Sequence, residues 1–403
     1  MNIGILGLGT VGSGVVETLA DLGESLGDIC GQELVIRKIL VQDLDKDRGL
    51  DIDRELLTRD FDSILEDETI DVILELTGDL EAAYGYIKSS LRRKKHVVTA
   101  NKAVVSKYFE ELSGLAEEEG VAFLYEASVG GGIPAIKTLR EQAQLNRILR
   151  IQAILNGTCN YILSRMVQEG LDYNKVLKIA QDLGYAEFDP SADVDGLDSL
   201  RKLRILGSLA GGGRIAEEDI FLRGIGNIAS RDIEYIKEMG RTVKLIGELE
   251  MGEAGFTAVV MPMLVRETDQ LAHVDLAYNS INFEGDRLGQ IKLFGQGAGK
   301  YPTANAVLSD LLDIALSSYR KGNPLGGARL ENLNSQLRAS YFLRLDRLDG
   351  PGFKALEPVL DRILLRDQGL LATTGELELF SLLGLLRDLG LEGDQYFLAK
   401  ILD

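Results

Sequence analysis

The stretch Asn2-Ile-Gly-Ile-Leu-Gly-Leu-Gly-Thr-Val-Gly12 decides the fold of the first part of the chain. Its first five residues have the composition of a buried strand, and residues 13–22 after it have the apolar spacing of a helix. Between them, the first glycine permits a tight turn, the second lets a pyrophosphate approach the backbone, and the third lets helix and strand pack closely. The helix N-terminus offers unpaired N–H groups to phosphate oxygens. A structural turn is the alternative, but this context predicts a dinucleotide site at Gly7, Gly9, Thr10, Val11 and Gly12.

Strand-like and helix-like segments alternate after this turn. Further strands are expected at residues 34–41, 71–77, 96–99 and 121–125, with helices that include residues 80–91 and 107–119. The alternation predicts an α/β fold with a Rossmann-type parallel sheet and helices on both faces. Ligands of such sheets bind outside the carboxyl ends of the strands. Four residues at these ends are therefore expected to contact the cofactor, namely Thr77, Gly78, Asn101 and Lys102.

The end of the second strand carries the residues that choose between the two nicotinamide dinucleotides. An acidic side chain there favours the free 2′-hydroxyl of NAD, and a nearby arginine favours the 2′-phosphate of NADP. Gln42 and Asp43 occupy this position; Asp43 favours NAD, while Lys46 and Arg48 leave NADP open. Residues 23–32 are expected to lengthen the first crossover, because Asp43 lies further from the glycine turn than such an acid usually does.

A second glycine-rich turn, Ser128-Val-Gly-Gly-Gly-Ile-Pro134, lacks the dinucleotide spacing. Consecutive glycines expose backbone carbonyl and amide groups. A cation and a substrate carboxylate are both physically reasonable ligands of this turn, and its residues leave that choice open.

Residues 184–202 concentrate charge in front of a helical apolar pattern at residues 203–210. Asp195 is the predicted N-cap of that helix. At about 100° per residue, Asp198 and Lys202 share the apolar stripe, whereas the opposite, solvated side is expected to carry Arg201, Arg204 and Ser208. An exposed ion pair with i,i+4 spacing would contribute only about 0.3–0.5 kcal/mol. Charges on an inward stripe are costly unless they are paired or used, so Asp198 and Lys202 are predicted to be functional. Lys102 is also predicted to be functional, and the alternative is an ordinary lysine on the exposed surface.

Beyond about residue 145 the pattern becomes a mixture of strands and helices. It includes strands at residues 150–155, 256–265, 279–283 and 290–293, and helices at 161–169 and 173–183. An α+β substrate domain with an open sheet, able to pair across a dimer, fits this pattern. The C-terminal part is predicted as strand 341–347, helix 353–363, strand 370–380, a leucine-rich helix to 389, and strand 395–402.

These patterns divide the chain into four predicted parts. A dinucleotide-binding domain is expected at residues 1–132, completed by a helix at 303–320. A substrate-binding, catalytic and dimerisation domain is expected at 133–302. A linker rich in Gly, Asn and Pro at 321–335 precedes a small unit at 336–403.

Composition restricts the partners and the location of the chain. A net charge of −19 argues against nucleic acid. Two cysteines make no disulfide framework, and two histidines exclude a multi-histidine zinc site. No apolar run approaches the roughly 20 residues of a membrane span, and a strand begins at residue 2, so we expect a soluble cytoplasmic protein without a signal peptide.

Seven motifs lie in order within about residues 1–320. They are Gly7-Leu-Gly-Thr-Val-Gly12, Thr99-Ala-Asn-Lys-Ala103, Glu126-Ala-Ser-Val-Gly-Gly-Gly-Ile-Pro134, Leu155-Asn-Gly-Thr-Cys-Asn-Tyr161, Gly184–Lys202, Tyr278-Asn-Ser-Ile281 and Gly295-Gln-Gly-Ala-Gly-Lys-Tyr-Pro-Thr-Ala304. Each motif is modest alone, but the ordered set is specific, and it resembles that of the homoserine dehydrogenase family.

This resemblance implies NAD(P)-dependent interconversion of L-homoserine and L-aspartate 4-semialdehyde in threonine, methionine and isoleucine biosynthesis. Reduction of the aldehyde needs a hydride on carbon and a proton on oxygen, and an ammonium group can supply the proton. The resemblance implies that Lys202 and Lys102 flank the reacting carbon and that Asp198 orients Lys202 and holds the reacting hydroxyl. The remaining implied substrate contacts are Glu187 on the α-ammonium, Asp193 close by, and Thr158 and Gly157 lining the same pocket.

The second glycine turn resembles the monovalent-cation site of the family. Sodium or potassium would be bound by backbone carbonyls of Glu126, Val129, Gly131 and Ile133 and would stiffen the junction between domains. The C-terminal unit resembles an ACT domain in its β-α-β order and in Asp349-Gly-Pro-Gly352. Only about 14 residues separate its predicted helices, which hardly fits two hairpin strands, so an abbreviated module is expected. It would either bind threonine as an effector or serve only for docking, and the family resemblance suggests a homodimer or higher homo-oligomer.

Many members of the family carry Arg where this chain has Gln42, which weakens the case for NADP.

Two alternative functions stay open at this point. A related NAD(P)-dependent dehydrogenase of another small amino acid would use the same lysine pair. A catalytically silent nucleotide-sensing protein would keep the Rossmann scaffold, but it would have no need of an inward proton donor such as Lys202.

Overall fold

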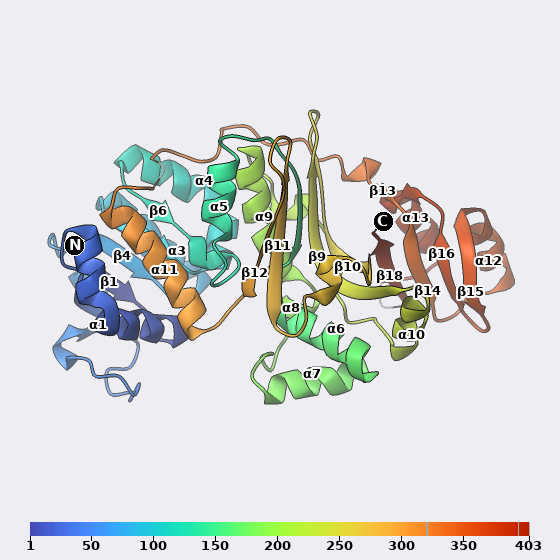
Figure 1. Cartoon of the computed structure of the whole chain (residues 1–403), viewed down its shortest axis with the longest axis horizontal. Helices are drawn as coiled ribbons and strands as arrows, with labels where there is room; N and C mark the ends of the chain where they lie inside the picture. The colour runs from blue at the N-terminus through green and yellow to red at the C-terminus, as the bar shows by residue number, and fades with distance from the viewer. Residues whose placement is uncertain (320, 394, 403) are drawn as a thin grey trace. The chain divides into compact units, whose positions relative to one another are not determined.

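The structure is a computed structural model that describes residues 1–319, 321–393 and 395–402. The chain forms two compact units, each assembled from separate segments (Figure 1). The first unit contains Met1–Arg147, Arg204–Ile215 and Gly295–Arg329, and the second contains Ile148–Leu203, Ala216–Phe294 and Leu330–Asp403. The predicted endpoints at residues 320 and 403 lie outside the described residues.

A parallel sheet forms the centre of the first unit. Its strands lie in the order β3-β2-β1-β4-β5-β6, and every neighbouring pair is parallel. They are β1 (Asn2–Leu6), β2 (Val35–Leu40), β3 (Leu57–Thr58), β4 (Val72–Glu75), β5 (His96–Thr99) and β6 (Phe123–Leu124). The predicted Rossmann-type sheet is confirmed. The short edge strand β3 was not predicted, because two residues carry too little of a strand pattern.

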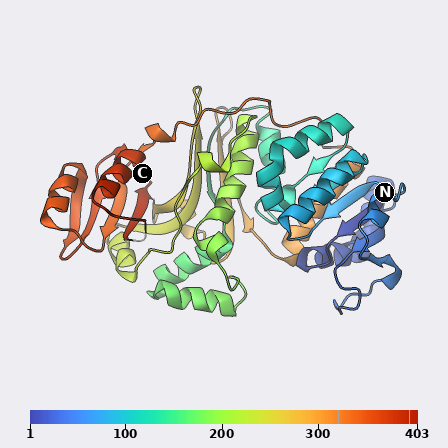
Figure 2. The same cartoon turned by 180° about the vertical axis from the view of Figure 1, so that it is seen from behind.

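Helices cover both faces of this sheet. α1 (Thr10–Cys30) and α11 (Lys300–Ala315) lie side by side on one face (Figure 1), and α3 (Leu80–Arg92) and α4 (Lys102–Glu119) lie together on the other (Figure 2). A Cβ on Gly14 of α1 would lie 2.8 Å from the Lys300 carbonyl oxygen, so the two helices approach closely at a glycine. Lys300 Nζ also donates to Glu17 at 2.7 Å. The sequence-distant helix α11 is thereby tied to the glycine-turn helix.

A large mixed sheet forms the centre of the second unit. Within the described residues it has ten strands, in the order β12-β11-β7-β9-β10-β18-β14-β16-β15, with β8 paired to β10. Its first part consists of β7 (Ile148–Ile154), β8 (Phe221–Leu222), β9 (Arg241–Met251), β10 (Phe256–Arg266), β11 (Tyr278–Gly285) and β12 (Gly289–Gln296). Four of these six strands were predicted, but β8, β9 and the helix α10 (Ser230–Glu238) were not. Lys244 and Glu248 explain the omission of β9, because they place charges at buried positions of a central strand.

The C-terminal part has the order β-α-β-β-α-β. It contains β14 (Tyr341–Leu345), α12 (Gly350–Leu356), β15 (Leu360–Arg366), β16 (Leu370–Thr374), α13 (Leu379–Asp388) and β18 (Tyr396–Ile401). The predicted helix at 353–363 was too long: α12 ends at Leu356, a 3₁₀ turn at Glu357–Val359 contains Pro358, and β15 begins at Leu360. The predicted strand at 370–380 was too long, because α13 begins at Leu379. β15 and β16 pair as an antiparallel hairpin between the two helices, so the expectation that this interval hardly fits two strands was also wrong.

Two kinds of contact join this C-terminal part to the rest of the second unit. β18 pairs parallel with β10, which makes the sheet continuous. Arg344 on β14 pairs with Asp232 of α10 at 2.9 Å, and both side chains are buried. Burial raises the pKa of the Asp232 carboxyl, and the Arg344 guanidinium opposes that rise. The tail is therefore part of the unit's core.

Among the described residues, the structure contains no helix with the length and apolar character that a bilayer crossing requires.

We expect Arg344→Met to lower the free energy of unfolding by about 3–5 kcal/mol, because it leaves the Asp232 carboxylate buried without its cation. Arg338→Met is the matched control: Arg338 is half exposed and contacts Glu376 at 3.3 Å, so its loss should cost at most about 1 kcal/mol. Urea denaturation followed by circular dichroism measures both values. Equal, small effects would show that the Arg344 contact does not hold the tail.

Candidate active site

The predicted inward acid and amine lie on α9 (Leu197–Gly211). Lys202 Nζ donates to Asp198 Oδ2 at 2.8 Å and to the Leu155 carbonyl oxygen at 2.7 Å. Asp198 is 3% exposed and Lys202 is 8% exposed, so both charges lie on the buried side, as predicted. Such a pair inside the protein loses its hydration and needs good geometry to offset that cost.

Two other predictions for this segment were wrong. Asp195 is not the N-cap of α9: it follows the short helix α8 (Ser191–Val194) as its C-cap, and the first α9 bond runs from Leu200 N–H to the Gly196 oxygen. Arg204 and Ser208 do not face solvent, since they are 2% and 0% exposed. Arg204 pairs with Glu110 of α4 at 2.6 Å and lies over the Phe109 ring. A second buried face of α9 explains this difference, and the spacing of apolar residues could not reveal it.

Asn156 connects the acids of this region. It is the N-cap of α6 (Gly157–Glu169), with its Oδ1 accepting from Cys159 N–H at 2.8 Å. Its Nδ2 donates to Asp193 Oδ1 at 2.7 Å and to Asp198 Oδ2 at 2.9 Å. The amide therefore fixes two carboxylates and the start of α6 together. Asn156 belongs to the motif at residues 155–161 but was not predicted as a site residue, although a capping residue beside predicted substrate contacts was the available signal.

The other predicted substrate residues lie at different depths. Gly157 has no room for a side chain, because a Cβ there would lie 2.9 Å from the Ala277 oxygen. Thr158 Oγ1 donates to the Tyr185 carbonyl oxygen at 2.6 Å, which ties α6 to the loop before α8. Glu187 is exposed on that loop, and its backbone carbonyl oxygen accepts from Gln181 Nε2 at 3.1 Å. The structure thus brings Asp193, Asp198 and Lys202 together around Asn156 and leaves the Glu187 carboxylate outside this cluster.

Cys159 is not a nucleophile candidate. Its buried Sγ donates to the Asp193 carbonyl oxygen at 3.1 Å. Burial, together with the Asp193 and Asp198 charges, holds the pKa of the thiol well above its usual value. A thiolate is the reactive form of cysteine, so this side chain has a structural role.

The glycine turn has the geometry that its sequence predicts. Gly7 has φ +99° and a Cβ on it would lie 2.8 Å from the Leu76 oxygen. A Cβ on Gly12 would lie 2.2 Å from the Gly7 oxygen. Gly9 is the N-cap of α1, and Thr10 and Val11 begin the helix. The turn therefore places the helix N-terminus at the end of β1, where phosphate groups of a dinucleotide bind.

The residues that follow β2 are exposed. Asp43 Oδ1 accepts from Asp45 N–H at 2.9 Å, and Arg48 Nη2 donates to the Asp43 carbonyl oxygen at 2.8 Å. Gln42 and Asp43 are both open to solvent. A carboxylate and a guanidinium therefore lie in the same loop, so the geometry leaves the choice of dinucleotide open.

The ends of β4 and β5 are joined by hydrogen bonds. Asn101 is the N-cap of α4, and its Nδ2 donates to the Thr77 oxygen at 3.3 Å. Lys102 is the first residue of α4 rather than a strand residue. Glu75, at the end of β4, accepts hydrogen bonds from Thr77 and Thr99 and is fully buried. Sequence reasoning missed Glu75, although an acid at the end of the apolar run Val72-Ile-Leu was a visible signal.

Residues 128–131 and 133 of the second glycine turn are buried, and the turn packs against residues 296–298. Gly130 and Gly131 have φ values of +80° and +56°, and a Cβ on Gly131 would lie 2.5 Å from the Gly297 carbonyl carbon. The four predicted carbonyl ligands are those of Glu126, Val129, Gly131 and Ile133. Among the hydrogen bonds of the described residues, none has the Val129 or the Gly131 carbonyl oxygen as its acceptor. Backbone oxygens of this kind are the ligand type that a hard monovalent cation requires.

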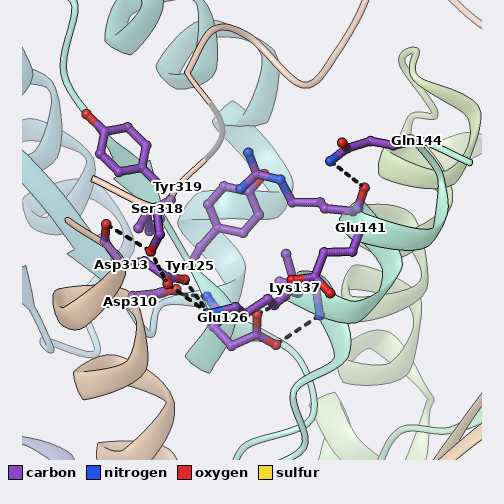
Figure 3. Close-up of a pocket in the computed structure, with 12 residues that line it drawn as sticks. Tyr125, Glu126, Lys137, Glu141, Gln144, Asp310, Asp313, Ser318 and Tyr319 are labelled. Atoms are coloured by element: carbon purple, nitrogen blue, oxygen red, sulfur yellow. Dashed lines mark hydrogen bonds and ion pairs between the residues drawn. The ribbon is translucent and has the colours of Figure 1, made fainter. Parts of the chain in front are cut away.

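The Glu126 side chain faces the other way, toward a cavity of about 290 Å³ (Figure 3). It accepts from the N–H groups of Ile136 and Lys137 at 2.9 and 2.7 Å, at the start of α5 (Ala135–Gln142). Its own N–H donates to Asp310 Oδ2 at 2.8 Å. Burial raises the pKa of Glu126 to about 7, and that of Asp310 is raised well above its usual value by burial and by Glu126. The side chain thus fixes the turn to α5 and α11.

Comparisons with known proteins agree with this arrangement. The homoserine dehydrogenase profile matches residues 134–312, and the profile of the NAD-binding domain of homoserine dehydrogenase matches residues 7–126. A homoserine dehydrogenase of Synechocystis is 45% identical over 78% of this chain and 73% of its own length. This chain belongs to the homoserine dehydrogenase family.

Solved structures of homoserine dehydrogenases share its fold. That of Thiobacillus denitrificans has a TM-score of 0.92 and 33% identity, and the match covers 100% of this chain and 98% of the other. A hyperthermophilic archaeal homoserine dehydrogenase in complex with NADPH has a TM-score of 0.66 and 26% identity, and covers 79% of this chain and 98% of its own. The chain is therefore an oxidoreductase with a nicotinamide cofactor and a small-molecule substrate, and its reaction belongs to the biosynthesis of threonine, methionine and isoleucine.

Proposed function

We propose that Lys202 transfers the proton in the interconversion of L-homoserine and L-aspartate 4-semialdehyde. The supporting observation is the buried ammonium held between Asp198 Oδ2 and the Leu155 oxygen. An ammonium in a low-dielectric site polarises a bound carbonyl oxygen more strongly than one in water. In the reducing direction Lys202 donates a proton to the aldehyde oxygen, and in the oxidising direction the neutral amine accepts it from the hydroxyl. A bound nicotinamide supplies or takes the hydride.

Asp198 positions this lysine and, in the proposal, accepts a hydrogen bond from the substrate hydroxyl. Asp193 and Glu187 bind the substrate α-ammonium, and Gly157 and Thr158 line the same pocket. The support for Asp193 is its contact with Asn156, which also contacts Asp198. Glu187 lies on an exposed loop, so this role requires the loop to bring its carboxylate to the substrate.

Lys102 is the second proton-donor candidate. It belongs to the first compact unit, whereas Lys202 belongs to the second. As the first residue of α4 it directly follows the Asn101 cap, close in sequence to the strand end where the nicotinamide is expected. The dinucleotide is bound, in the proposal, by residues Gly7, Gly9, Thr10, Val11, Gly12, Gln42, Asp43, Thr77, Gly78, Asn101 and Lys102.

We infer a preference for NAD over NADP. The Asp43 carboxylate at the end of β2 suits a free 2′-hydroxyl and repels a 2′-phosphate. Arg48 lies in the same loop, and one relative has been solved with NADPH, so NADP is the competing cofactor.

A monovalent cation, sodium or potassium, is proposed at the carbonyls of Glu126, Val129, Gly131 and Ile133. The Val129 and Gly131 carbonyl oxygens support this, because both residues are buried and a cation would satisfy these two acceptors. The ion would hold the turn rigid and take no part in proton or hydride transfer.

The tail is proposed to be an ACT-like regulatory module that binds threonine, and the enzyme is proposed to be a homodimer or higher homo-oligomer. The β-α-β-β-α-β order of the tail supports the ACT-like regulatory module. Docking without an effector is the alternative, supported by the continuous pairing of β18 with β10.

The direct test is oxidation of NADH, and then of NADPH, by purified protein with aspartate semialdehyde. We expect oxidation of both with a higher kcat/KM for NADH. Equal or better use of NADPH would overturn the preference, and no oxidation of either would overturn the assigned reaction.

Lys202→Ala should lower kcat by roughly 10²–10⁴ while dinucleotide affinity changes little, because only proton transfer and positioning are lost. Lys178→Ala is the matched control: Lys178 forms an i,i+4 pair with Asp182 at the same 2.8 Å, but on an exposed surface. If the Lys202→Ala enzyme kept most of its activity, Lys202 would not be the proton donor and Lys102 would be the next candidate.

Replacement of sodium and potassium by tetramethylammonium should reduce activity or thermal stability, because that ion is too large for a carbonyl-lined turn. Restoration by one alkali ion identifies it. Equal rates and melting temperatures in all three salts would remove the cation from the proposal.

Threonine should inhibit the intact chain, and loss of the tail's function should abolish that inhibition. Because the tail is part of the second unit's sheet, the first test titrates the intact chain with threonine and, as the control, with serine. Identical, threonine-insensitive rates would leave docking as the tail's role.

A further inference from the structure

Glu75 occupies the position in the first unit where strand order reverses. The sheet runs outward from β1 through β2 on one side and from β4 through β5 on the other. Glu75 is the last residue of β4 and pairs with Leu6, the last residue of β1 before the glycine turn. Sheets of this class bind their ligands outside the strand ends at this reversal.

The Glu75 carboxylate is completely buried and bonded through both oxygens. Oε1 accepts from the Thr77 N–H at 2.8 Å and from Thr77 Oγ1 at 2.5 Å. Oε2 accepts from Thr99 Oγ1 at 2.6 Å. One carboxylate therefore holds the residues that follow β4 and the last residue of β5.

These bonds close into a ring that reaches α4. Thr99 Oγ1 accepts from the Asn101 N–H at 3.0 Å, and Asn101 Nδ2 returns to the Thr77 oxygen at 3.3 Å. Asn101 Oδ1 accepts from Val104 N–H at 3.2 Å and so caps the helix that begins at Lys102. Displacement of Glu75 would therefore move both loops together.

Core packing does not explain a carboxylate at this position. Val72, Ile73 and Leu74 of the same strand are fully buried apolar residues. Among the described residues no Lys, Arg or His side chain forms an ion pair with Glu75, and burial raises the pKa of its carboxyl. A buried charge without a cation costs free energy that an apolar residue would avoid.

We propose that Glu75 is a positioning residue for the nicotinamide end of the cofactor, acting through Thr77 and Thr99 on the Thr77-Gly78 and Asn101-Lys102 loops. The inference rests on the proposed cofactor contacts at these loops. Because the Glu75 side chain is completely buried, it acts through these loops and not by direct contact with cofactor or substrate.

Glu75→Leu removes every acceptor at nearly constant volume, whereas Glu75→Gln keeps one oxygen for Thr77 and offers its amide to the Thr99 hydroxyl. Titration calorimetry with NADH measures affinity independently of turnover. We expect Glu75→Leu to weaken NADH binding about 10- to 100-fold, as the loss of hydrogen bonds to a charged group implies. The KM for homoserine should stay within about twofold, and Glu75→Gln should restore most of the affinity.

Thr99→Val tests the same ring if Glu75→Leu fails to fold. Its matched control is Thr58→Val, because Thr58 Oγ1 at the end of β3 accepts from Asp60 N–H at the same 3.0 Å but does not contact Glu75. We expect weaker NADH binding for Thr99→Val alone. Equal NADH affinity in all variants, with similar losses of melting temperature for Thr99→Val and Thr58→Val, would overturn the proposal. Inactivity of the unsubstituted chain toward homoserine would instead refute the proposed function, since NADH affinity is measured separately.

Discussion

The buried contact of Lys202 with Asp198 is the constraint on which the substrate side of this enzyme depends. Both charges lie inside the second unit, where an unpaired ion would cost several kcal/mol. Asn156 offsets part of that cost by donating to Asp198 and Asp193 while it caps α6. The same few bonds therefore hold a helix start, two carboxylates and an ammonium in fixed positions. Fixed charges that need no rearrangement during the reaction are the main source of electrostatic stabilisation in enzymes.

The cofactor side depends on a different constraint, the close approach of backbone to backbone. Gly7, Gly12 and Gly14 each occupy a place where a Cβ would lie within 3 Å of a carbonyl oxygen. These glycines set α1 against β1 and against α11. Glu75 then connects the ends of β4 and β5. The first unit thus uses glycine for proximity and one buried carboxylate for alignment.

Much of this arrangement was predictable, since it depends on local patterns. The order strand, glycine turn and helix predicted the parallel sheet, and helical spacing placed Asp198 and Lys202 on the buried side of α9. What sequence could not supply was the environment on the far side of an element. Arg204 is buried because Glu110 and Phe109 of α4 cover it. β9 was missed because Lys244 and Glu248 occupy core positions, where Lys244 donates to the Val274 oxygen and Glu248 pairs with Arg150. In the tail, the helix predicted at residues 353–363 ran past Pro358 and so included the first residues of β15.

Chemical rescue tests the central claim most directly, because it returns the missing ammonium to its place. Lys202→Ala removes the side chain from a buried position beside Asp198, and a small amine such as methylammonium can occupy the space. The account predicts that methylammonium raises the rate of aspartate semialdehyde reduction by this variant in a saturable manner and leaves the parent enzyme unchanged. A variant that binds dinucleotide normally but shows no rescue at any amine concentration would contradict the assignment of Lys202 as the proton donor.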